Sequence, residues 1–141
     1  VDFSQPSFRK RLAIIDLESG RIGFHRVAHG KNSGGLYAKA FSDTIGSNMS
    51  SIGLFRIDEK YIGSHGPSLR LEGLDADTNK NARERGIVIH SADYVSVRSI
   101  LLNFSQGFRL GRSEGCFAMS REGLDDLFAR LTDPAHVFAF A

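Results

Sequence analysis

Short apolar runs separated by turn-forming residues fill the first two thirds of this chain, and this pattern constrains its fold most. The runs are residues 12–17, 22–28, 52–57, 68–74 and 86–90. Glu18-Ser19-Gly20 is typical of a turn, so the first two runs predict a hairpin. Residues 29–51 are rich in Gly, Ser, Asn and Lys without apolar periodicity, which predicts a loop. The pattern therefore predicts a mainly β fold, with 86–90 as its clearest buried strand.

Two helices are predicted in the last third of the chain. Apolar residues at helical spacing follow Ser96 at positions 97, 100, 101 and 104, and follow Ser120 at positions 124, 127, 128 and 131. Both serines are suitable N-caps, and Asp133-Pro134 ends the second helix. Residues 137–140 predict a last strand. We expect two short helices packed on a sheet.

The bulk composition is that of one ordinary globular domain. A chain of 141 residues buries roughly two-thirds of its unfolded surface around a single core. Its 41% hydrophobic and 24% charged residues are typical of such folds. We expect residues 1–141 to form a single domain, with residues 1–11 as an N-terminal tail.

The sequence gives no indication of nucleic-acid binding, a membrane span or a nucleotide cofactor. The net charge is only +2 and the longest cationic run is Arg9 to Arg11, so nucleic-acid binding is not indicated. No apolar stretch approaches the roughly 18 residues of a membrane span. Neither a Gly-x-Gly-x-x-Gly turn nor a Gly-Lys-Ser phosphate loop is present, so we expect no nucleotide cofactor.

Cys116, the only cysteine, is the residue on which a functional interpretation depends. A single cysteine excludes an internal disulfide and leaves a small buried hydrophobic residue or a reactive thiol. Cys116 ends the polar loop 111–116, where Gly115 lets the backbone turn its N–H groups toward a developing oxyanion. Nearby Arg112 is expected to favour the thiolate. An inert structural cysteine is the open alternative.

A thiol nucleophile needs a base, and His90 is the best placed of the five histidines. It ends the apolar run 86–90, so a rigid strand would hold its ring, with Ser91 and Asp93 beside it as orienting partners. Histidines at strand ends are also common as structural residues. The assignment of His90 as the base therefore depends on its pairing with Cys116.

The other histidines do not predict a metal site. His25 and His29 are four residues apart, but they fall in a strand-like segment in which this spacing does not place two side chains together. We therefore expect no bound metal. His65 lies in the glycine-rich segment 63–67 and is either a pocket residue or an exposed turn histidine.

Two segments resemble the catalytic domain of the murein L,D-transpeptidases, the YkuD-like superfamily, in a divergent branch. Residues 87–91 (Ile-Val-Ile-His-Ser) are similar to the family's strand that ends in the base histidine. Residues 112–116 (Arg-Ser-Glu-Gly-Cys) are similar to its Ser-x-Gly-Cys nucleophile loop. The likeness extends from about Leu12 to Ala141 and includes residues 29–30, 63–69 and 81–85.

The resemblance implies a single-domain L,D-transpeptidase-like β-sandwich or barrel and an enzyme located in the periplasm or cell envelope. Cys116 would attack the carbonyl at the L-centre of diaminopimelate in a peptidoglycan stem peptide, and His90 would protonate the departing D-Ala. An amine of a second stem or of a protein, or water, would then resolve the thioester. The residues expected to hold the oxyanion or the substrate are Gly115, Ser113, Arg112, Ser91 and His65.

Two positions depart from the common family loop. Glu114 stands where the better-known branch has histidine, and Ala118 where it has a basic or amide residue. Donor and acceptor preferences therefore do not carry over. Two alternatives stay open: an L,D-carboxypeptidase or endopeptidase that hydrolyses the same peptides, and a non-catalytic peptidoglycan-binding module in which Cys116 and His90 are structural.

Overall fold

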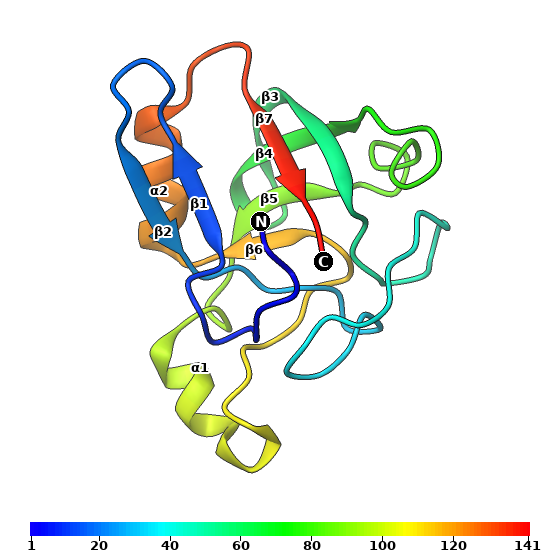
Figure 1. The fold of residues 1–141 in the computed structure, drawn as a ribbon, viewed down its shortest axis with the longest axis vertical. Coiled ribbons are helices and arrows are strands. Elements are labelled where there is room, and N and C mark those ends of the chain that lie inside the picture. Colours follow the sequence, from blue (N-terminus) through cyan, green and yellow to red (C-terminus); the bar gives the residue numbers. More distant parts are fainter.

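Two β-sheets organise the computed structural model, which describes residues 1–141 (Figure 1). The strands are β1 (Leu12–Ile15), β2 (Ile22–His25), β3 (Gly53–Gly63), β4 (Gly66–Gly73), β5 (Val88–Ser91), β6 (Phe117–Met119) and β7 (His136–Ala139). β1 and β2 form a separate hairpin, and the other five form a curled sheet in the order β6-β5-β4-β3-β7. Only β5 and β6 run parallel. With 32% of residues in strands and 13% in helices, the predicted mainly β fold is confirmed.

Two strands differ from the expectation. β3 continues to Gly63 instead of ending at Ile57, because its charged half pairs with β4 in a long hairpin whose turn contains His65. β6 was not predicted, since three residues are too short to show a period of two. It forms because Phe117, Ala118 and Met119 are fully buried beside β5.

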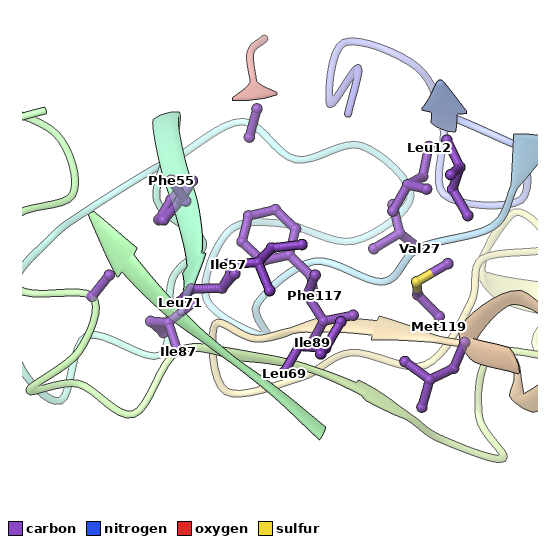
Figure 2. Close-up of a cluster of buried hydrophobic side chains, with 14 of the residues drawn as sticks. Leu12, Val27, Phe55, Ile57, Leu69, Leu71, Ile87, Ile89, Phe117 and Met119 are labelled. Atoms are coloured by element: carbon purple, nitrogen blue, oxygen red, sulfur yellow. The ribbon is translucent and has the colours of Figure 1, made fainter. Parts of the chain in front are cut away.

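The core contains buried side chains from β1, β3, β4, β5 and β6 (Figure 2). Phe117 contacts Phe55 edge to face, with 5.4 Å between ring centroids, and stacks on Phe3 at 6.0 Å. Because Phe3 is fully buried and Asp2 bridges to Phe140, the expectation that residues 1–11 form a tail is wrong. The segment closes one side of the core, and its burial supplies the free energy that orders it.

The helices form where their caps predicted, but α1 packs on the core through one residue only, whereas α2 packs through several. α2 (Arg121–Arg130) begins after Ser120, whose hydroxyl accepts a hydrogen bond from Gly123 N–H at 3.1 Å, and it buries Leu124 against the core. α1 (Val97–Leu102), capped by Ser96, contains no buried residue. Ile100 alone of its apolar face packs, partly buried, against a cluster that includes Ala118 of β6, so the expectation that this face covers a sheet holds for one residue and fails for the others. η1 (Phe104–Gln106) follows it as one 3₁₀ turn.

No helix of the structure has both the length and the apolar character required to cross a membrane.

Candidate functional site

The His90 ring is held at the end of β5 in a defined orientation. The residue is buried, and its Nδ1 lies 2.9 Å from the carbonyl oxygen of Ser91. A carbonyl only accepts, so Nδ1 carries the proton and Nε2 presents a free lone pair. Burial lowers the pKa of His90, which favours the neutral ring. Ser91 thus orients His90 through its backbone, and Asp93 makes no hydrogen bond to the ring.

The loop that carries Cys116 is anchored to residues 29–34. Ser113 pairs with Gly30 in a β-bridge, donating from its N–H to His29 O at 3.0 Å and accepting from Lys31 N–H at 2.7 Å. Arg112 Nη1 donates to the carbonyls of Lys31 and Gly34 at 2.9 and 3.0 Å. Arg112 is therefore bound to the loop backbone and orders it. Arg112 was expected to favour the Cys116 thiolate, but it is not among the groups that shift the pKa of Cys116.

Ser113 closes the nucleophile loop from within. Its buried hydroxyl donates to Cys116 O at 2.7 Å and accepts from Gly115 N–H at 3.1 Å. Gly115 N–H is therefore occupied in this structure, contrary to its expected availability for an oxyanion. The Cys116 N–H donates to no atom of the chain, and it is the available backbone donor at this point of the loop.

Gly115 is required by the backbone of this loop. Its φ of +120° lies in a region that disfavours side chains, and a Cβ there would meet Met49 O at 2.8 Å. The same Cβ would lie 3.2 Å from Arg85 Nη2. Only glycine therefore lets the loop pass this close to residues 49 and 85.

The strand register places Cys116 and His90 on one face of the sheet. His90 is opposite Ala118 in the parallel pair β5–β6. Side chains alternate along a strand, so Cys116 shares the face of Ala118, and Val88 shares that of His90. The Cys116 thiol lies against the start of β5, where it donates to Gly86 O at 3.6 Å. It makes no hydrogen bond to His90 here, and catalytic contacts of this kind often tighten only with substrate.

The pKa of Cys116 is raised above its ordinary value. Burial is the largest cause, and it outweighs a hydrogen bond from the Val88 backbone and the positive charge of Arg85, both of which favour the thiolate. The raised pKa of Cys116 favours a neutral thiol, and the lowered pKa of His90 favours a neutral imidazole, in the absence of substrate.

Arg85 is the cation that sequence reasoning missed as a site residue. Its side chain is almost fully buried, 3.8 Å from the carboxylate of Asp43. It donates to the carbonyl oxygens of Ser42 and Met49 at 2.8 and 2.6 Å. Arg85 therefore holds the loop at 42–51 while its positive charge acts on the Cys116 thiol. The available signal was its place in segment 81–85, one of those that resemble the family.

His65 and Glu114 complete the surroundings of the site. The His65 ring stacks on His90 with centroids 4.1 Å apart, which brings the β3–β4 turn over β5. Its charge lowers the pKa of His90 further. Glu114 is exposed and forms an ion pair with Lys31 at 2.8 Å. The negative charge of Glu114 opposes formation of the thiolate at Cys116.

A second buried polar pair lies behind the loop. Arg11 Nη2 donates to His29 Nδ1 at 2.8 Å, and His29 Nε2 faces Gly34 O at 3.3 Å. Both contacts require a neutral His29 ring protonated at Nε2. Burial, and then the charge of Arg11, lower the pKa of His29 to about 4. This pair supports residues 29–34, to which the nucleophile loop is bound.

His25 and the two hollows described below lie outside this site. His25 Nε2 is 2.7 Å from Asp126, which links β2 to α2. No group of three His, Cys, Asp or Glu side chains is arranged to hold a metal ion. Two hollows of about 260 and 390 Å³ open beside residues 131–133 and 138–141, and neither is lined by a candidate site residue.

Residues 1–140 match the family model of the L,D-transpeptidase catalytic domain. The chain belongs to this family. L,D-transpeptidase domains act on peptidoglycan stem peptides and are usually associated with the cell envelope. Searches of curated proteins and of solved structures found no match to the chain.

Proposed function

We propose that this L,D-transpeptidase domain transfers acyl groups of peptidoglycan stem peptides through a thioester on Cys116, with His90 as general base and acid. The observation that supports the proposal is the β5–β6 register: His90 lies opposite Ala118, two residues after Cys116, and its Nδ1 bonds to the Ser91 carbonyl. Membership in the family supplies the substrate class.

Acylation begins with the neutral pair. The stem peptide displaces water from the site, and the thiol rotates from Gly86 O toward His90 Nε2, which takes its proton. The sulfur then forms a bond to the diaminopimelate carbonyl carbon. The Cys116 N–H donates to the resulting oxyanion, a contact typically worth about 3 kcal/mol. The C–N bond to D-Ala breaks, and His90 returns the proton to the leaving amine.

Deacylation reverses these roles. An amine of a second stem attacks the thioester carbon while His90 accepts its proton, and the C–S bond breaks to release the thiolate, which regains a proton from His90. Water in place of the amine would give hydrolysis. Arg85, beside Gly115 and the sulfur, stabilises the thiolate in both steps.

Product analysis tests this function. Purified disaccharide-tetrapeptide stems are incubated with the wild-type protein and with Cys116→Ala, and the products are separated by mass. Crosslinked dimers that lack one D-Ala support transpeptidation, and tripeptides alone support the carboxypeptidase alternative. Unchanged stems with correctly folded wild-type protein would favour the non-catalytic module and contradict the proposal.

A further inference from the structure

The segment between the two candidate catalytic residues carries an exposed apolar surface. α1, η1 and the residues up to Arg109 form a projection, here called the α1 protrusion (residues 97–109), that extends away from both sheets (Figure 1). Five of its large apolar side chains are 48% to 71% exposed. They are Val97, Leu101, Leu102, Phe104 and Phe108. Ile100 of α1 packs against a small core cluster, but the other large apolar side chains are exposed together, and such a patch is typical of an interaction surface.

The charges on the α1 protrusion are positive, and the nearest acidic residues in the sequence are exposed Asp93 before α1 and Glu114, which pairs with Lys31. Residues 94–113 contain Arg98, Arg109 and Arg112 but no Asp or Glu. None of these three arginines forms an ion pair. The neighbouring loop adds exposed Tyr37 and Lys39, and Leu36 of that loop lies next to Gly107. The exposed apolar side chains thus share this segment with two arginines, Arg98 and Arg109, that form no ion pair with a carboxylate.

We propose that the α1 protrusion docks on the surface of an anionic phospholipid bilayer. Apolar side chains would enter the boundary between headgroups and acyl chains, while the arginines contact lipid phosphates. The proposal concerns binding alone and does not rest on the proposed catalytic function.

The size of the α1 protrusion favours a bilayer over a second copy of the chain. A helix of six residues is only about 9 Å long. A surface of that length is small beside the roughly 800 Å² that each partner contributes to a stable protein interface. Membrane docking has no such minimum, because a few inserted side chains and phosphate contacts act together. The exposed outer face of the β1–β2 hairpin is a useful contrast. Leu17, Ile22 and Phe24 are also exposed there, but their charged neighbours Asp16, Glu18 and Arg21 give no excess of positive charge.

Cosedimentation with lipid vesicles tests the proposal. The probes are vesicles of phosphatidylglycerol and phosphatidylcholine in equal amounts, and vesicles of phosphatidylcholine alone. Wild-type protein should partition into the anionic vesicles and bind the neutral ones more weakly. The triple variant L101S/L102S/F104S should lose at least about thirtyfold in partition coefficient. R98Q/R109Q should lose about thirtyfold on anionic vesicles and little on neutral ones.

The matched control is L17S/I22S/F24S, which removes equally exposed apolar residues from the β1–β2 hairpin and should bind as the wild type does. Cys116→Ala should also bind normally, which separates this inference from the catalytic one. Absence of wild-type binding to anionic vesicles would overturn the proposal. So would equal losses in the control, or a wild-type dimer in sedimentation velocity that the triple variant alone abolishes while vesicle binding is unchanged.

Discussion

Protonation of His29 is expected to destabilise the fold as the pH falls below neutrality. The folded protein holds the pKa of His29 at about 4, against an ordinary value of 6.5, because the ring is buried and Arg11 donates to its Nδ1. Between these two values the unfolded chain binds a proton that the folded chain excludes. The contribution of His29 to stability is therefore fully present above pH 6.5 and is lost as the pH falls toward 4.

The magnitude follows from the width of that interval. At 1.36 kcal/mol for each pKa unit, a lowering from 6.5 to about 4 corresponds to about 3 kcal/mol of unfolding free energy. This loss is a large fraction of the about 5 to 15 kcal/mol that stabilises a typical domain. The nucleophile loop would loosen with it, since Ser113 N–H donates to His29 O.

Urea unfolding followed by circular dichroism from pH 7.5 to 3.5 measures the effect. His29→Gln keeps an acceptor for Arg11 and a donor for Gly34 without a titrating ring, so its stability should fall about 3 kcal/mol less than that of the wild type over this range. His136→Gln removes an exposed histidine and serves as the control. Parallel pH profiles for wild type and His29→Gln would refute the reasoning.

Four further outcomes are expected. His90→Ala should slow acylation by about 10² to 10⁴ in single-turnover assays with stem peptides, and an unchanged rate would make His65 the next candidate base. Arg85→Gln should cost about 3 to 5 kcal/mol in urea unfolding because it leaves buried carbonyls and Asp43 without their cation, and a change below 1 kcal/mol would show that the arginine is not structurally needed. Free Cys116 should react with iodoacetamide at pH 7 more slowly than an unstructured cysteine peptide, because burial raises its pKa, and faster labelling would indicate a resting thiolate. Chelators should leave turnover unchanged, whereas activity lost with chelator and restored by zinc would establish a metal site.

The strand pattern and the two N-caps could be predicted from the sequence because they depend on neighbouring residues. Residues 87–89 are all apolar, with no alternating polar side chain, so this strand was expected to be buried, and it is. Ser96 and Ser120 cap their helices, as their positions before the apolar periodic segments indicated. The packing of α1 could not be predicted in this way. Its spacing of apolar residues is that of a buried face, and periodicity alone does not say whether the fold supplies a surface to cover it.

Cys116 and His90 were selected as candidate site residues from local motifs, but the contacts that support their loop depend on distant parts of the chain. Arg85 contacts residues 42–51, and Arg11 contacts His29, across separations that no local pattern encodes. The hydrogen bond between Ser113 Oγ and Gly115 N–H is likewise set by the conformation of the folded loop. This bond occupies the Gly115 N–H and leaves the Cys116 N–H as the unoccupied backbone donor of the loop.

The most direct test of the central claim is the mass of the intact protein during reaction with a tetrapeptide stem. Rapid acid quenching of the wild type should reveal an adduct with the mass of the stem less D-Ala, attached to Cys116 and removed by hydroxylamine as a thioester. Cys116→Ala should show no adduct. Turnover of stems by Cys116→Ala, or an adduct mapped to another residue, would contradict the account.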